Sequence, residues 1–236
     1  MQKSMIKILS LADIITILNA VLGFLALLMV FSNQLPIAAS LILLGLLTDG
    51  LDGIVARRMR KSSIGEYLEA IADMISLSIA PLALLYKIYY DTVFSQQYVH
   101  LLFGIVLIFS LVCSIIRLSS FSLFKQKQFF LGLPTSASAI FLVSASFLKP
   151  DILYILPVII ILSLAMISSI LYPKTGLKIN LITAVLIIVT ILLDSMFYNI
   201  APLLLLAALF SYIIFGPIYL HFKRRSHDVG TEDTPS

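Results

Sequence analysis

The stretch TDGLDGIVARRMRKSSIGEYLEAIAD, residues 48–73, carries five acids where the surrounding apolar sequence predicts membrane-spanning helices, and four of them form two closely spaced pairs. Asp49 and Asp52 are three residues apart, and Glu69 and Asp73 are four residues apart. On a helix, both spacings put the two side chains on one face. Two such helices packed side by side would direct all four acids into one small volume.

A cluster of ionised carboxylates in an apolar setting needs a compensating cation or proton. Oxygen ligands without Cys or His suit a hard divalent cation better than zinc. The stretch therefore predicts a site for Mg²⁺ or Mn²⁺ formed by the four paired acids, which are Asp49, Asp52, Glu69 and Asp73.

The composition of the chain is that of an integral membrane protein. Of its 236 residues, 60% are hydrophobic and 12% are charged, and the mean hydropathy is +1.08. These values lie outside the range of soluble globular domains. Lipid accommodates only helices and closed barrels, and the apolar runs are too long for barrel strands, so we expect an all-α, polytopic helical bundle. The single cysteine, Cys113, excludes an intrachain disulfide.

About eight apolar segments are long enough to be transmembrane helices, since each needs about twenty residues. They cover residues 11–32, 36–57, 66–86, 98–119, 132–148, 152–172, 179–198 and 200–221. We therefore expect a single transmembrane domain over residues 1–222, followed by a short, basic and then polar tail over residues 223–236 that is disordered.

The distribution of basic residues predicts the orientation of the bundle. With a cytoplasmic N-terminus, fourteen of the sixteen Lys and Arg residues fall on the inside, and only Lys87 and Lys149 fall outside. Because basic residues concentrate on the cytoplasmic side of membrane proteins, both termini are predicted to be cytoplasmic. The acidic cluster would then open toward the cytoplasm from the cell membrane.

The pattern Asp49-x-x-Asp52-Gly53-x-x-Ala56-Arg57, then seven residues, then Gly65-x-x-x-Glu69-x-x-x-Asp73, resembles the signature of the CDP-alcohol phosphotransferase family. The resemblance implies an integral membrane transferase that attacks the pyrophosphate of a CDP-linked lipid with an alcohol and releases CMP. It implies two Mg²⁺ or Mn²⁺ ions held by the four acids, with Asp73 accepting the proton. It further implies membrane lipids and a second copy of the chain, as a homodimer, as partners, and no nucleic acid.

The same resemblance implies contacts with the CDP-linked lipid from Gly53, Arg57 and either Ser62 or Ser63. Gly53 and Ala56 lack bulk, which lets a nucleotide approach the helix backbone, although close helix packing explains small residues as well. Glu69 stands where the family usually has Asp, which leaves the metal count and the activity open. The spacer of seven residues, where eight is common, leaves the choice of serine open.

Two further segments resemble the serine-using branch of this family, the phosphatidylserine and archaetidylserine synthases. The first helix carries T-x-x-N-x-x-x-G at Thr16, Asn19 and Gly23, and Phe130–Pro134 reads F-x-G-L-P. The resemblance favours L-serine as the acceptor and implies CDP-lipid contacts from Thr16 and Asn19, which could instead be polar contacts between helices. A pocket for the acceptor or its phosphate would draw on four residues, Arg117, Gly132, Pro134 and Thr135.

Several alternatives remain open from the sequence. Glycerol 3-phosphate or inositol phosphate could replace serine, because Arg117, Lys125 and Lys127 could bind a second phosphate. The acids could also form the ion site of a cation transporter, or the chain could be a relative inactivated at Glu69. Ester-linked acyl chains, as in CDP-diacylglycerol, and ether-linked isoprenoid chains, as in CDP-archaeol, are not distinguished.

Overall fold

The computed structural model describes residues 9–58, 62–94, 96–120, 123, 129–174, 176–193 and 200–229, without the side chains of residues 52–58, 177–178, 193 and 222–229. The prediction of an almost entirely helical chain is confirmed for this part. Its elements are, in chain order, α1 (Leu11–Phe31), α2 (Leu35–Arg58), α3 (Gly65–Asp73), the π-helix η2 (Met74–Ile79), α4 (Ala80–Phe94), α5 (Gln97–Ser119), β1 (Phe129–Leu131), α6 (Thr135–Leu148), α7 (Ile152–Met166), β2 (Leu171–Pro173), α8 (Leu177–Leu193) and α9 (Ile200–Val229).

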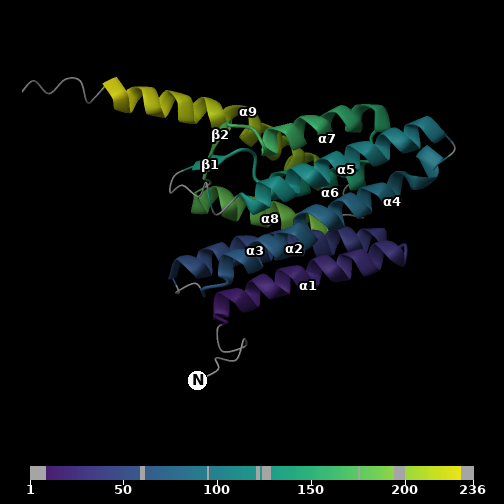
Figure 1. Ribbon diagram of the computed structural model, residues 1–236, viewed down its shortest axis with the longest axis horizontal. Coiled ribbons are helices and arrows are strands. Elements are labelled where there is room, and N and C mark those ends of the chain that lie inside the picture. Colours follow the sequence, from purple (N-terminus) through teal and green to yellow (C-terminus); the bar gives the residue numbers. More distant parts are fainter. Residues whose placement is uncertain are drawn as a thin grey trace, which may run out of the picture.

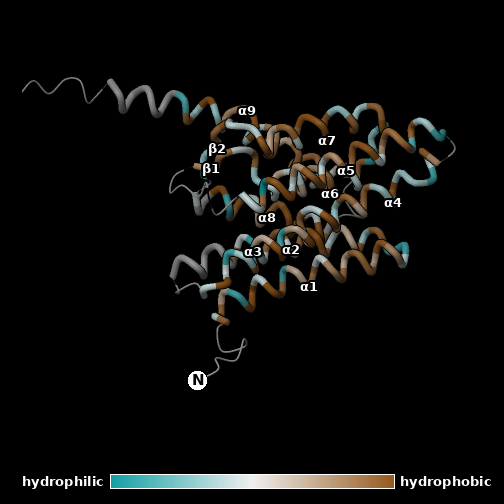
Figure 2. The backbone as a smooth tube through the Cα atoms, viewed as in Figure 1, coloured by the Kyte–Doolittle hydropathy of each residue, from teal (hydrophilic) through white to brown (hydrophobic). Residues whose placement is uncertain are grey.

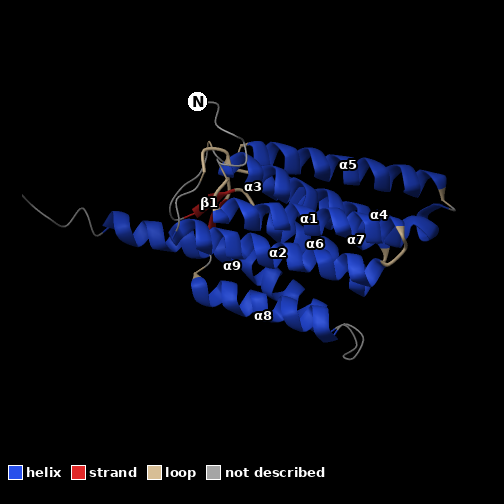
Figure 3. Cartoon of the chain, turned by 90° about the horizontal axis from the view of Figure 1, so that it is seen from below, coloured by secondary structure: helices blue, strands red, loops and turns tan. Residues whose placement is uncertain are grey.

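The helices run back and forth along one long direction of the molecule (Figure 1). Helix α1 packs along α2 and against α3 and η2, α5 packs against α7, and α9 packs against α6 and α8. Seen from below, α8 lies at the edge of the bundle (Figure 3). The end that holds the start of α3 and the two strands is called the motif end here, and the opposite end, with the connection between α6 and α7, is called the far end.

Polar residues gather toward the ends of the helices, whereas apolar residues dominate their middle portions (Figure 2).

An acid caps the start of α1. The Asp13 carboxylate accepts a hydrogen bond from the Ser10 backbone N–H at 2.6 Å, and the Ser10 hydroxyl accepts one from the Asp13 N–H at 3.3 Å. This reciprocal cap satisfies two amide groups that would otherwise lack partners at the start of the helix. Asp13, which is 2% exposed, therefore has a structural role.

Helix α3, η2 and α4 form one continuous helix over residues 65–94, with a π-helical segment directly after Asp73. Elements α1, α2, α5 and α6 all contact η2, so the π-helix lies in the interior of the bundle. A Cβ atom on Gly23 of α1 would lie only 2.6 Å from the Ser76 Cα and 2.8 Å from its Cβ. The backbones of α1 and η2 can therefore meet only because position 23 has no side chain.

We expect Gly23→Ala to destabilise the protein by about 1–3 kcal/mol, because the added methyl group forces α1 away from η2. Gly104→Ala on α5 is the matched control, since a Cβ atom there meets nothing within 4 Å. That control should be neutral or stabilising by about 0.5–1 kcal/mol, because alanine favours the helix. Thermal unfolding of the two purified variants measures both effects, and equal unfolding temperatures would contradict the close contact.

The prediction of helices over residues 132–148 and 152–172 is wrong at two of the four boundaries. Helix α6 begins at Thr135 and α7 ends at Met166, and short strands take the flanking residues. Strands β1 and β2 pair antiparallel, with Phe130 opposite Tyr172. Both strands contain aromatic residues, which favour extended backbone. The all-α prediction is corrected to a helical bundle with one small two-stranded sheet at the motif end.

Four helices in the described part of the chain are long and apolar enough to cross a membrane: Leu11–Phe31, Gly65–Phe94, Gln97–Ser119 and Ile200–His221. The other four apolar segments also lie on helices, but their apolar portions are shorter, at 10–17 residues. The backbone of α9 continues to Val229, beyond the predicted domain boundary at residue 222, and residues 230–236 lie outside the description.

Candidate active site

The four motif acids lie on two helices, α2 and α3, and the start of α3 lies at the motif end of the bundle (Figure 1). Asp49 and Asp52 belong to the last turns of α2, and Glu69 and Asp73 belong to α3. The side chains of Asp49, Glu69 and Asp73 are half-buried, whereas that of Asp52 is outside the described set. Helix α1 packs against both α2 and α3, so a single helix supports the two acid-bearing segments.

Asn19 of α1 makes a direct hydrogen bond to the motif. Its side-chain amide donates to Oδ1 of Asp73 at 3.1 Å, across 54 residues of sequence. Asn19 is fully buried, and it shares one face of α1 with Asp13, Thr16 and Gly23. Thr16 donates instead to the Ala12 carbonyl within its own helix, at 3.2 Å. The structure thus brings Asn19 to the acids, whereas the hydrogen bond from Thr16 to Ala12 lies within α1.

The donor chemistry at this end suits a hard divalent cation, because the motif supplies only carboxylate oxygens. Among the side chains that the structure describes, no three His, Cys, Asp or Glu residues gather closely enough to hold a metal ion by themselves. Asp52 is not among those side chains. Asp49, Asp52, Glu69 and Asp73 remain the predicted ligands of the ion.

The residues predicted to contact CDP follow the acids along the chain. Gly53, Ala56 and Arg57 lie on the backbone of α2, but their side chains fall outside the described residues. Ser62 accepts a local hydrogen bond from the Ile64 N–H at 3.3 Å, and Ser63 is exposed. Ser62 therefore has a structural use in the turn before α3, while the choice between the two serines stays a prediction.

The F-x-G-L-P segment is hydrogen-bonded to the C-terminal end of α7 and to the residues that follow it. The Gly132 N–H donates to the Ile170 carbonyl at 2.8 Å, and the Leu133 N–H donates to the Ala165 carbonyl at 2.9 Å. The last carbonyl groups of a helix have no hydrogen-bond donors within that helix. The F-x-G-L-P segment supplies a donor to one of these carbonyl groups. Gly132 has φ +74°, and a Cβ atom on it would lie 2.2 Å from the Met166 carbonyl oxygen. Only glycine fits this position.

Arg117 holds the same segment from the other side. It is 9% exposed in the last turn of α5, and its Nε donates to the Leu133 carbonyl at 3.3 Å. A cation is favourable at this end of a helix, because the helix dipole is negative there. Pro134 then caps α6, and Thr135, which is 6% exposed, begins it. The four predicted pocket residues thus lie on one continuous junction between α5, α6 and α7.

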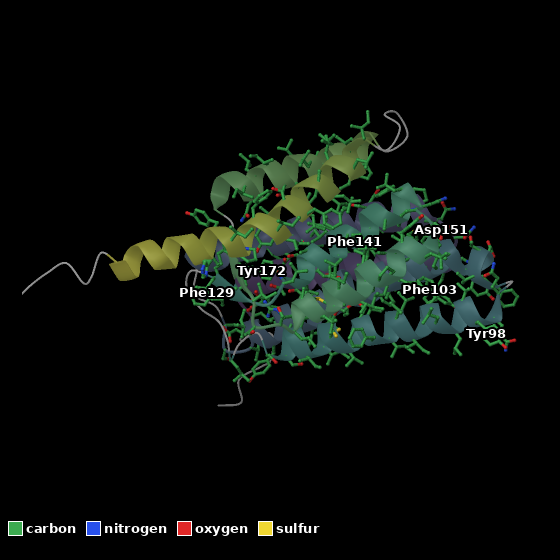
Figure 4. The ribbon with its side chains drawn as sticks, turned by 90° about the horizontal axis from the view of Figure 1, so that it is seen from above. Tyr98, Phe103, Phe129, Phe141, Asp151 and Tyr172 are labelled. Carbon is green, nitrogen blue, oxygen red and sulfur yellow. The ribbon has the colours of Figure 1, made fainter. Side chains whose placement is uncertain are left out.

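Strand β2 and helix α9 complete that junction. The Tyr212 hydroxyl donates to the Pro173 carbonyl at 3.0 Å, and its ring lies against that of Tyr172, with centroids 5.8 Å apart. Burial raises the pKa of Tyr172 above its ordinary value. Figure 4 shows Phe129 and Tyr172 near one another, and Tyr98 and Asp151 at the far end. Tyr172 and Tyr212 had no sequence signal that would mark them.

The profile of the CDP-alcohol phosphatidyltransferase family matches residues 9–215 of the chain. This range takes in the acid motif, Asn19, the F-x-G-L-P segment and most of α9. The match therefore extends well beyond the short motif that suggested the resemblance, and it includes the helices that support the acids.

Individual relatives show the same relationship. Archaetidylserine synthase of Methanothermobacter thermautotrophicus is 32% identical over 180 residues, which cover 73% of each chain. CDP-diacylglycerol–serine O-phosphatidyltransferase of Methanocaldococcus jannaschii is 35% identical over 174 residues, covering 73% of this chain and 78% of that protein. The Saccharomyces cerevisiae protein of the latter name is 34% identical over 127 residues, covering 50% and 43%.

Proposed function

Because the chain belongs to the CDP-alcohol phosphatidyltransferase family, we propose that it transfers the phosphatidyl-type group of a CDP-linked lipid to L-serine and releases CMP. The observation that carries the choice of serine is the similarity over 73% of the chain to two proteins named for a serine-using activity. The F-x-G-L-P segment supports it, since it lies at the same end of the bundle as the acids.

Asp73 is proposed to accept the proton of the serine hydroxyl. The serine oxygen forms a bond to the lipid-bearing phosphorus, and the bond from that phosphorus to the oxygen retained by CMP breaks. A half-buried carboxylate whose orientation is held by a hydrogen bond is suited to this task, because a general base must lie within hydrogen-bond reach of its proton. Arg57 and Gly53 would bind the CDP moiety, and Arg57 would contact its phosphates.

The divalent ions, Mg²⁺ or Mn²⁺, would be held by Asp49, Asp52, Glu69 and Asp73, the only acids in the family-type pattern. When bound, such ions neutralise phosphate charge and stabilise the departing CMP. Acids of the two helices would have to share the ions, because the described side chains alone do not form a group of three. Glu69, one methylene longer than Asp, would set the distance on the α3 side.

The eight helical segments are proposed to cross the cell membrane, with both termini and the motif end on the cytoplasmic side. The distribution of Lys and Arg supports this orientation. The four long apolar helices and the family both indicate a membrane protein. CDP-lipid would enter sideways from the bilayer, while serine would enter from the cytoplasm.

CMP release by the purified protein tests the proposal directly. CDP-diacylglycerol and CDP-archaeol are each offered with L-serine, glycerol 3-phosphate or inositol phosphate. We expect release that depends on serine. CMP release only with a phosphorylated alcohol would indicate that the junction around Arg117 binds the phosphate of the acceptor. Cation flux into liposomes without CDP-lipid, and no CMP release, would favour a transporter.

Removal of divalent ions should abolish serine-dependent CMP release. A chelator withdraws the ions, and the four carboxylates then face the pyrophosphate without charge compensation, so we expect a loss of about 10³-fold or more, within the range for removal of phosphoryl-transfer groups. Mg²⁺ or Mn²⁺ should restore the activity, whereas Zn²⁺ should not. Activity that persists after exhaustive chelation would rule out the metal assignment.

The substitution Glu69→Asp distinguishes an active enzyme from a relative inactivated at this position. If the chain is active, Glu69→Asp should mainly change the Mg²⁺ or Mn²⁺ concentration needed for half-maximal activity. If instead the parent is inactive and Glu69→Asp creates activity, the chain is a relative inactivated at this position.

A further inference from the structure

One face of α1 carries polar residues that lie toward the interior of the bundle. Its buried residues are Ala12, Asp13, Thr16, Asn19, Gly23, Ala26 and Val30. The Asp13 carboxylate caps the helix, and Thr16 donates to its own helix backbone, so both have local partners. The side chain of Asn19 donates a hydrogen bond that leaves the helix and reaches Asp73, an acid of the motif.

The position of the Asn19 side chain is determined by contacts on two sides. On α2, a Cβ atom on Gly45 would lie 3.0 Å from the Asn19 Oδ1 and 3.5 Å from the Ser76 Cβ. One turn further along α1, Gly23 lies directly against the backbone of Ser76. The missing side chains at Gly23 and Gly45 therefore let α1, α2 and η2 converge around Asn19. The amide has little room to turn away from Asp73.

The side-chain oxygen of this amide is a buried acceptor. Asn19 is fully buried, and its Oδ1 has no hydrogen-bond partner among the described residues. A buried polar atom without a partner opposes folding, so an apolar side chain of similar shape would suit this position better for stability alone. The arrangement makes sense if Nδ2 serves the acid that it contacts.

The hydrogen bond acts on the orientation of the carboxylate. The Asn19 Nδ2 lies 3.1 Å from Oδ1 of Asp73, and the bond limits rotation of the carboxylate about its side-chain axis. The side-chain amide is a neutral donor that gives up no proton in the reaction, so any effect of Asn19 on turnover passes through Asp73.

We propose that Asn19 is a positioning residue of the reaction, which orients the Asp73 carboxylate through the bond from Nδ2 to Oδ1. This inference rests on the proposed function, in which Asp73 is the base. It replaces a direct role of Asn19 in binding the CDP-linked lipid with an indirect role in turnover.

The test compares Asn19→Leu, which keeps the branched shape and removes both polar atoms, with Thr190→Val. Thr190 is 1% exposed on α8 and donates to the Leu186 carbonyl of its own helix, so this variant controls for loss of a buried polar group. For Asn19→Leu we expect a fall in kcat of roughly 10²-fold, as for a misoriented catalytic group. The KM for CDP-diacylglycerol should be unchanged, and the Tm should be equal to that of the wild type or higher.

Two results would overturn the inference. A raised KM for CDP-diacylglycerol with unchanged kcat would make Asn19 a lipid ligand. A lowered Tm with full kcat in the folded fraction would make it a structural residue. Should Asn19→Leu fail to fold, Asn19→Ala, which always fits the space, takes its place with the same expected loss of kcat.

Failure of the proposed function has a different signature. In that case the wild-type protein releases no CMP with serine, and the comparison of Tm values then decides the inference. If the Asn19 amide orients Asp73 and does not stabilise the fold, the Tm of Asn19→Leu should not fall. A clear fall in Tm, larger than that of Thr190→Val, would contradict the inference.

Discussion

Asp73→Asn should reduce serine-dependent CMP release by about 10³-fold or more. Loss of a general base alone typically costs 10²- to 10⁴-fold, and the substitution also removes a carboxylate oxygen from the proposed metal ligands. The change is almost isosteric, and Asp73 is half-buried at the end of α3, so the fold should be retained. Steady-state CMP release, with Tm measured in parallel, checks both statements.

Glu66→Gln is the matched control for this variant. Glu66 lies on the same helix but outside the motif pattern, and its side chain is exposed. Its substitution should leave the rate within about twofold, because a surface change away from the site has little effect. Titration with Mn²⁺ separates the two roles of Asp73. Recovery at high Mn²⁺ would mean that Asp73 only holds metal, and undiminished turnover would remove it from the reaction altogether.

Gly132→Ala should destabilise the protein by roughly 2–4 kcal/mol and abolish most activity. The φ angle of +74° costs a residue with a side chain about 1–2 kcal/mol, and the new methyl group would overlap the Met166 carbonyl oxygen, at 2.2 Å. Relief of that overlap requires β1 to move off the end of α7. The bond from Arg117 to the Leu133 carbonyl would then be lost with it.

Gly176→Ala controls for the loss of a glycine near the same end of the bundle, since a Cβ atom there meets nothing within 4 Å. Thermal unfolding should separate the two variants by several degrees or more. The rate of serine-dependent CMP release should also be compared between the two variants. A Gly132→Ala protein that is as stable and as active as Gly176→Ala would show that the junction between α5, α6 and α7 tolerates a different backbone.

Much of the helical organisation follows from local sequence. Each of the eight apolar segments contains a helix in the part of the chain that the structure describes, because long apolar runs have few other ways to satisfy their backbone groups in lipid. The positions of the acids on α2 and α3 also follow from their spacing. The predicted family is confirmed, because the match covers residues 9–215. The orientation in the membrane and the metal ions stay predictions.

The remainder depends on contacts between distant parts of the chain. Strands β1 and β2 have three residues each and are separated by some forty residues, too little sequence to mark either one. The bond from Asn19 to Asp73 joins residues 54 positions apart, and periodicity within either helix cannot reveal it. The closeness of Gly23 to Ser76 likewise appears only when α1 and η2 are placed together.

The π-helix at Met74–Ile79 constrains how this protein can vary in length. A π-helical turn contains an additional residue relative to an α-helical one, and each residue of an α-helix turns the chain by about 100°. Loss of a single residue between Asp73 and Ala80 would let this segment close as an ordinary α-helix, so the acidic half of the helix and the half that carries the fully buried Leu84 and Leu85 would keep their relative faces. A further inserted residue has no such outlet, and it would rotate one half against the other by about 100°. We therefore expect this segment to tolerate the loss of one residue better than the gain of one.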